Sequence, residues 1–195
     1  MIIERFFWQT RNDVELIALV KSAIERSQHP DGRVFTPVFG AYGDVIMELR
    51  SDSSDAAAAF WKHWHESGLN DEFAPKVNPL ITSKGRHETW EILEPVAMQR
   101  GRKYVDWRTF VVKPGYEKQA VQLLAKTRQT FNRYEILSPL GGPMFTLALV
   151  LEFDSLDAYL QEWDVWIRDT STPEFWQEWH EITDLGGESV PYKLR

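Results

Sequence analysis

Asp106 and Arg108 are the first pair of side chains whose types and spacing could do chemistry. They lie two residues apart in the run Tyr104–Val112. If that run is a strand, both side chains point to the same face of its sheet. An arginine in this position could hold the carboxylate or phenolate of a ligand. The alternative is a structural ion pair, and the sequence leaves both interpretations open.

Two histidines follow a tryptophan by four residues, in segments that nearly repeat each other. The segment Phe60–Glu66 reads FWKHWHE, and Phe175–Glu181 reads FWQEWHE. Residues four apart share a helix face, so His65 lies beside Trp61 and His180 beside Trp176. One interpretation is an aromatic core stripe with a histidine at its edge. The other is an imidazole at the mouth of a pocket, acting as a general base or as a haem ligand.

His65 is the more interesting of these two histidines. The residue equivalent to it in the repeat described below is Ile167, which is apolar. We therefore expect His65 to face inward, where a buried imidazole needs a hydrogen-bond partner or a ligand. His63 and His65 point apart on a helix, and the chain has no cysteine. We expect no metal site. His87 begins a strand and is expected at the surface.

A duplication determines where these residues lie. Leu49–Phe73 and Leu151–Phe175 align without a gap, always 102 residues apart. The identical pairs include Leu49/Leu151, Ser53/Ser155, Asp55/Asp157, Trp61/Trp163 and Trp64/Trp166. One offset that spans strands, turns and helices indicates a duplicated domain. We therefore predict a first repeat over 1–94, a linker over 95–103 and a second repeat over 104–195.

Each repeat has the pattern of a ferredoxin-like fold, which is strand–helix–strand–strand–helix–strand. The patterns of apolar and turn residues predict strands over 2–9, 34–39, 45–49, 87–93, 104–112, 134–137, 144–153 and 190–194. The run Met144–Phe153 is almost continuously apolar, which favours a strand buried on both faces. The simplest cover for its second face is the sheet of the other repeat. The predicted fold class is α+β, with two tandem repeats forming one eight-stranded barrel with its helices outside.

Composition excludes several classes of function. The net charge is −7, with no basic stripe, so nucleic acid and anionic membranes are unexpected partners. No apolar run approaches the ~20 residues that span a bilayer. The absence of cysteine fits a reducing compartment, and we expect a cytoplasmic protein. The sequence has no glycine-rich phosphate loop, dinucleotide fingerprint or nucleophile elbow.

The segment Tyr104–Gly115 resembles the opening of NIPSNAP-family domains. In that family an acidic residue, an arginine and an aromatic residue alternate along the first strand before Lys-Pro-Gly, and Asp106, Arg108 and Phe110 match these positions. The segment Leu151–Tyr159 resembles the family's strand-to-helix junction. In the first repeat Glu4 and Trp8 keep the acidic and aromatic positions, whereas Phe6 replaces the arginine.

The resemblance implies a dimeric α/β-barrel fold, whose superfamily includes small monooxygenases, haem-degrading enzymes and relatives of chlorite dismutase. It implies a protein that binds a small apolar or aromatic ligand between helices and sheet. Because the duplication supplies the second sheet within the chain, we expect a monomer or a homodimer. The implied chemistry is that of a cofactor-free or haem-linked monooxygenase; no cofactor is predicted, and haem is the alternative. The candidate catalytic residues are His65, Arg108 and Asp106. The candidate ligand-binding residues are Phe60, Trp61, Trp64, Phe110, Trp163, Trp166 and His180. The competing hypothesis is a non-catalytic scaffold whose aromatic residues only fill the core.

Overall fold

The computed structural model describes most of the chain as two compact units. It describes residues 1–39, 44–83, 85–95, 102–127, 134–142, 144–168 and 173–195, without the side chains of 127, 165–168 and 185–187. Unit 1 comprises Met1–Glu91 with the short pieces Leu140–Gly142 and Lys193–Arg195. Unit 2 comprises Ile92–Pro139 and Pro143–Tyr192.

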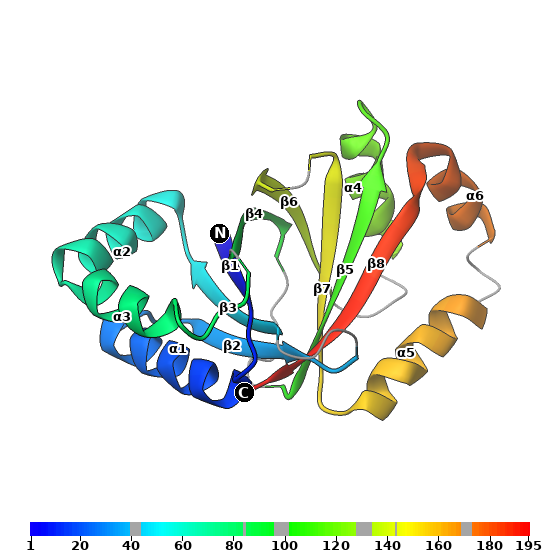
Figure 1. Cartoon of the computed structure of the whole chain (residues 1–195). Helices are drawn as coiled ribbons and strands as arrows, with labels where there is room; N and C mark the ends of the chain where they lie inside the picture. The colour runs from blue at the N-terminus through cyan, green and yellow to red at the C-terminus, as the bar shows by residue number, and fades with distance from the viewer. Residues whose placement is uncertain (40–43, 84, 96–101, 128–133, 143, 169–172) are drawn as a thin grey trace. The chain divides into compact units, whose positions relative to one another are not determined.

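Unit 1 is built from one sheet with helices packed on one of its faces (Figure 1). Its elements are β1 (Ile2–Gln9), α1 (Asp13–Ser27), β2 (Gly32–Pro37), β3 (Asp44–Ser51), α2 (Ser54–Glu66), α3 (Leu69–Val77) and β4 (Arg86–Glu94). The strands are ordered β4-β1-β3-β2, and each neighbouring pair is antiparallel. The split order places the first strand in the middle of the sheet, between the last and the third.

Unit 2 repeats this arrangement. Its elements are β5 (Tyr104–Val112), α4 (Glu117–Thr127), β6 (Glu135–Gly141), β7 (Thr146–Phe153), α5 (Leu156–Arg168), α6 (Pro173–Ile182) and β8 (Thr183–Leu194). The strands are ordered β8-β5-β7-β6. The βαββαβ pattern expected for each repeat is thus confirmed, with an additional short helix before the last strand of each.

Local sequence explains where the helices begin. The side chain of Asn12 accepts a hydrogen bond from the amide of Glu15 and caps α1. Ser53 accepts from the amide of Ala56 at the start of α2, and Ser155, 102 residues later, accepts from Ala158. A short side-chain oxygen satisfies an amide hydrogen that the first helical turn leaves without a backbone partner. The duplication has therefore preserved this helix cap as well as the sequence around it.

Each unit has its own apolar core. In unit 1 the stripe Leu16, Val20 and Ile24 of α1 packs against Val34, Met47 and Leu49 of the sheet. In unit 2 helices α4 and α6 pack against β5, β6 and β7. Every residue of β7 is buried, as the apolar run of the sequence predicts.

Several predicted strand boundaries were wrong, among them the end of β6, which is Gly141 rather than residue 137. The last strand begins at Thr183, seven residues before the predicted Val190, because the pair Gly186-Gly187 weakens the strand pattern there. Strand β7 begins at Thr146, whereas Met144 and Phe145 precede it and are exposed. The sequence pattern also predicts Phe131 in a helix and Pro143 in a turn, and both residues lie outside the described residues.

Gly32 gives a first test of the packing in unit 1. A Cβ atom on Gly32 would lie 2.4 Å from Cγ2 of Ile24 and 3.3 Å from Cδ2 of Leu49. Since a β-branched side chain moves little in a helix, we expect Gly32→Ala to lower the free energy of unfolding by about 1–3 kcal/mol. Urea unfolding followed by circular dichroism measures this change.

Gly141→Ala is the matched control for this test. A Cβ atom there meets nothing closer than 4.0 Å, so we expect a change within about 0.5 kcal/mol. Equal losses in the two variants would contradict the close approach of α1 to β2.

Candidate functional site

The helix-covered face of the unit 1 sheet carries a continuous cluster of polar and aromatic side chains. Because side chains alternate along a strand, Glu4, Phe6 and Trp8 of β1 share this face. Trp61 of α2 contacts Phe6 (ring centroids 5.3 Å apart), and Phe73 of α3 lies edge-on to Trp8 (6.3 Å). The two helices thus supply an aromatic wall over the central strand.

A carboxylate, an indole and an imidazole meet in this cluster. The indole Nε1 of Trp61 donates to both carboxylate oxygens of Glu4, at 2.9 and 2.7 Å. Nε2 of His87 lies 3.4 Å from Oε1 of the same carboxylate. The imidazole also stacks on Phe6, its cross-strand partner, with ring centroids 4.2 Å apart and planes 8° apart. These contacts fix the imidazole on two sides.

The exposure of these groups differs in a way that suits acid–base chemistry. The side chain of Glu4 is 8% exposed, whereas that of His87 is 47% exposed. The carboxylate is therefore fixed inside, and the imidazole can reach a molecule that approaches from outside. Histidine can accept and release a proton near neutral pH, and a neighbouring carboxylate stabilises the imidazolium that forms. We call Glu4, Phe6, Trp61 and His87 the unit 1 site.

The equivalent positions of unit 2 hold different chemistry. Nε of Arg108 donates to Oδ2 of Asp106 at 2.5 Å, and Oγ of Ser189 donates to Oδ1 at 2.8 Å. The guanidinium carbon of Arg108 lies 4.3 Å from the ring centroid of Trp163. Both charged side chains are buried. We call Asp106, Arg108, Trp163 and Ser189 the unit 2 site.

Neither of the two histidines singled out by sequence lies in these sites. The expectation that His65 faces inward is wrong, since His65 is exposed in the last turn of α2. The inward stripe of α2 runs through Ala57, Phe60, Trp61 and Trp64, and His65 falls at the edge of that stripe. His180 is likewise exposed, although its ring remains beside Trp176 (6.1 Å) as its spacing predicts.

The predicted aromatic residues are divided among several surroundings. Trp61 and Trp163 belong to the two sites. Trp64 is buried in a core cluster with Ala23 and Leu69. Phe60 packs against Trp61 and Trp64, and Phe110 lies edge-on to Trp179. The side chain of Trp166 lies outside the described part of the chain.

The sequence analysis did not predict that His87 contacts Glu4, although the repeat contains a clue to this contact. Glu4 is equivalent to Asp106, and His87 to Ser189, at the offset of 102 residues. A search for positions that are polar in both repeats would have selected these four residues together.

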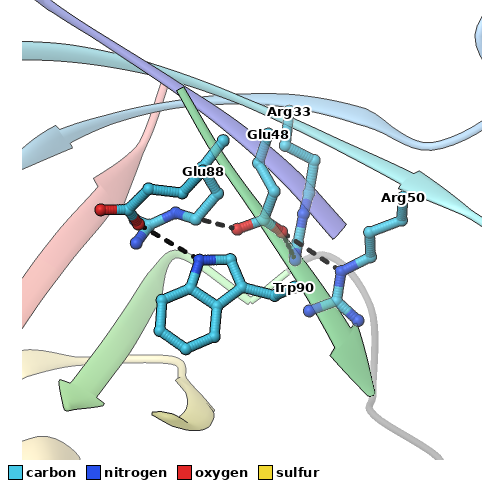
Figure 2. A network of polar contacts seen from close by, with 6 residues as sticks. Arg33, Glu48, Arg50, Glu88 and Trp90 are labelled. Carbon is cyan, nitrogen blue, oxygen red and sulfur yellow. Dashed lines mark hydrogen bonds and ion pairs between the residues drawn. The ribbon is translucent and has the colours of Figure 1, made fainter. Parts of the chain in front are cut away.

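The opposite face of the unit 1 sheet holds a second polar network (Figure 2). Glu48 is buried and lies 2.7 Å from Nη2 of Arg33, 3.2 Å from Nε of Arg50 and 3.7 Å from Nε of Arg5. The strand register places Glu88, Arg5, Glu48 and Arg33 side by side across the four strands. Opposite charges therefore alternate along this row, an arrangement that favours this register of the sheet.

The charge of Glu48 makes the stability of the protein depend on pH. Burial by itself raises the pKa of Glu48, but attraction to Arg33, Arg50 and Arg5 outweighs burial and lowers the pKa from 4.5 to about 2. A lowered folded-state pKa adds stability above the unfolded value, and this contribution disappears as pH falls through the folded value. We expect the free energy of unfolding to decline between pH 4.5 and pH 2.

Urea unfolding at pH 5, 4, 3 and 2 measures this decline. Other carboxylates also titrate in this range, so Glu48→Gln is the reference, since it lacks the contribution of Glu48. A difference between the two proteins that stays constant over this range would contradict the lowered pKa.

Comparison with solved structures shows which fold the chain has. An anthrone oxidase-like protein matches with a TM-score of 0.69 at 12% identity, covering 100% of this chain and 91% of that chain. A monooxygenase-like protein from Listeria innocua matches with a TM-score of 0.56 at 11% identity, covering 99% and 94%. A chlorite dismutase from Candidatus Nitrospira defluvii, in complex with cyanide, matches with a TM-score of 0.59 at 9% identity, covering 100% and 90%.

Other comparisons add little. A NIPSNAP domain protein from Burkholderia xenovorans matches over 52% of this chain with a TM-score of 0.40 at 15% identity, too weakly to support a conclusion. No protein-family model and no curated protein matches the sequence. Among the described helices, none combines the length and apolar character needed to cross a membrane. The whole-chain matches, together with the two βαββαβ units, show that this protein has the dimeric α/β-barrel fold, with both ferredoxin-like repeats in one chain.

Proposed function

We propose that the unit 1 site binds a small neutral aromatic compound and that His87, supported by Glu4, removes a proton from it. The observation that carries this proposal is the half-exposed imidazole 3.4 Å from a buried carboxylate. The ring of Phe6 stacks on the imidazole, and the rings of Trp8 and Trp61 pack against Phe6. These aromatic surroundings favour an aromatic ligand. Glu4 carries negative charge at this place, which favours a neutral ligand over an anionic one.

The reaction that fits this site is oxidation of an acidic aromatic carbon by molecular oxygen. Removal of a proton from a CH₂ group between aromatic rings gives an electron-rich carbanion, and the proton moves to the imidazole. Oxygen is the co-substrate: CH₂ and O₂ give C=O and H₂O, so the carbon loses four electrons and O₂ gains them. Anthrone has such a CH₂ group, and the anthrone oxidase-like and monooxygenase-like neighbours favour this class of reaction.

Each residue of the unit 1 site has a separate role in this proposal. His87 accepts the proton. Glu4 orients the imidazole and stabilises its charged form. Trp61 is a positioning residue, because its indole N–H holds both oxygens of Glu4 in place. Phe6 supports one face of the imidazole.

The haem alternative finds less support in the residues that the structure describes. Haem iron needs a side-chain ligand in an apolar slot, and the predicted ligands His65 and His180 are exposed at the ends of their helices. These two histidines therefore do not fit a haem ligand, and we derive no step through haem. We expect titration with ferric haem to give no saturable Soret band that depends on His65 or His180. The variants His65→Ala and His180→Ala should therefore give the same spectra as the wild-type protein.

The test of the proposed function is binding and oxidation of anthrone by the purified protein. We expect tryptophan fluorescence to be quenched by anthrone without oxygen, and oxygen to be consumed when it is admitted. Glu4→Gln keeps the size of the side chain and should reduce oxygen consumption more than binding. Absence of both binding and oxygen consumption in the wild-type protein would contradict the proposal and favour a non-catalytic scaffold.

A further inference from the structure

The unit 1 and unit 2 sites occupy equivalent places in the two repeats. Glu4 and Asp106 lie at the same position of the first strand, and Trp61 and Trp163 at the same position of the second long helix. His87 and Ser189 lie in the last strand, and each contacts the acidic residue of its own unit. The duplication therefore produced two copies of one arrangement, and their present contacts can be compared directly.

The two copies differ at the residue two positions after the acid, which lies on the same face of the strand. Position 6 is Phe, which supports the imidazole of His87. Position 108 is Arg, which donates to the acid itself and lies over Trp163. In unit 1 the tryptophan N–H donates to the carboxylate, whereas in unit 2 the tryptophan ring faces the guanidinium. In unit 2 the guanidinium of Arg108 and the hydroxyl of Ser189 hold the carboxylate, whereas in unit 1 the indole and the imidazole do so.

The groups around each acid decide what it can do near neutral pH. In unit 2 the acid is faced by Arg108 of β5 and by Ser189 of β8, whose hydroxyl lies 3.5 Å from the hydroxyl of Tyr159 of α5. Histidine is the side chain that most often transfers a proton in catalysis, and among the described residues no histidine faces the acid of unit 2. In unit 1 the acid is faced by His87 of β4 and by Trp61 of α2. Side-chain alternation on β4 places Arg86 and Glu88 on the opposite face.

We infer that the two repeats have divided their roles, so that unit 1 carries the proton-transfer site and the unit 2 site is a buried ion-pair lock. The lock joins three elements: Ser189 ties β8 to Asp106 of β5, and Arg108 of β5 packs on Trp163 of α5. This division rests on the proposed function of unit 1, but the lock itself does not. Of the two sites formed by the described residues, one is accordingly reactive.

Substitutions in the unit 2 site should lower the stability of the protein, whereas substitutions in the unit 1 site should lower turnover. Removing one partner of a buried ion pair leaves the other charge without compensation, whereas removing both is much less harmful. We therefore expect Arg108→Met and Asp106→Asn each to lower the Tm by roughly 10 °C or more, and the double variant to recover most of that loss. Glu4→Gln and His87→Gln should leave the Tm close to that of the wild type or raise it, because residues kept for activity are often unfavourable for stability.

The experiment measures thermal unfolding by circular dichroism and oxygen consumption with anthrone for all five variants. Ser189→Ala is an additional variant that weakens the lock mildly and should keep turnover. If Arg108→Met keeps its Tm and loses turnover, unit 2 is a second reactive site and the inference is overturned. If the single and double variants of unit 2 lose equal stability, the ion pair is not a lock and the inference is again overturned.

The turnover measurement tests the proposed function, and the Tm measurements test the ion pair of unit 2 separately. If the wild-type protein does not act on anthrone, the proposed chemistry of unit 1 falls and the division of roles falls with it. The three Tm values of the unit 2 variants would still establish or overturn the lock by themselves.

Discussion

Glu48→Gln should lower the free energy of unfolding by about 3–5 kcal/mol. Glu48 is the buried carboxylate on which Arg5, Arg33 and Arg50 converge. Glutamine has the same size but no charge, so the substitution removes the attraction without leaving a cavity. The guanidinium groups then repel one another in surroundings from which water is largely excluded. Urea unfolding at pH 7, followed by circular dichroism, measures the loss.

Glu72→Gln is the matched control for this prediction. Glu72 lies 2.7 Å from Arg26, but both side chains are about half exposed, at 54% and 49%. Exposed ion pairs contribute less than about 1 kcal/mol, so the same chemical change should cost little there. Similar losses in the two variants would mean that burial does not determine the contribution of the Glu48 network.

His87→Gln should lower the turnover of anthrone by about 10²- to 10⁴-fold, the usual contribution of a general base. Glutamine keeps a polar group of similar size at the surface but cannot accept the proton. The fold should be intact, because His87 is half exposed and contributes little to the core. Steady-state oxygen consumption gives kcat and KM, and the loss should fall mainly on kcat.

His65→Gln and His180→Gln are the controls for this prediction. Both side chains are exposed in the last turns of their helices. We expect each variant to retain turnover within about twofold of the wild type, since surface changes of this kind alter little. If turnover falls as much in His65→Gln as in His87→Gln, His65 takes part in the reaction, as the sequence analysis first suggested.

The sequence predicts the fold well because local patterns and the repeat agree. The strands over Ile2–Gln9 and Tyr104–Val112 were predicted with their observed boundaries. The fold class followed from the repeat, since one offset fixes the same order of elements twice. The division of the chain at 95–103 stays a prediction.

The site was harder to predict because it depends on contacts between distant strands. His65 was chosen from helical spacing, which says which residues share a face but places that face only approximately. His87 meets Glu4 because β4 pairs with β1, across more than eighty residues of sequence. The Glu48 network has the same origin, since its arginines come from three neighbouring strands. Asp106 and Arg108, two apart on one strand, could be paired from sequence, and they do form an ion pair.

The most direct test of the account is hydrogen–deuterium exchange of the CH₂ group of anthrone in D₂O without oxygen, followed by proton NMR. This measurement isolates proton removal from every later step with O₂. The wild-type protein should accelerate exchange over buffer alone, Glu4→Gln should be slower, and His87→Gln should match the buffer rate. Acceleration that persists fully in His87→Gln, or none in the wild-type protein, would contradict the assignment of proton transfer to the unit 1 site.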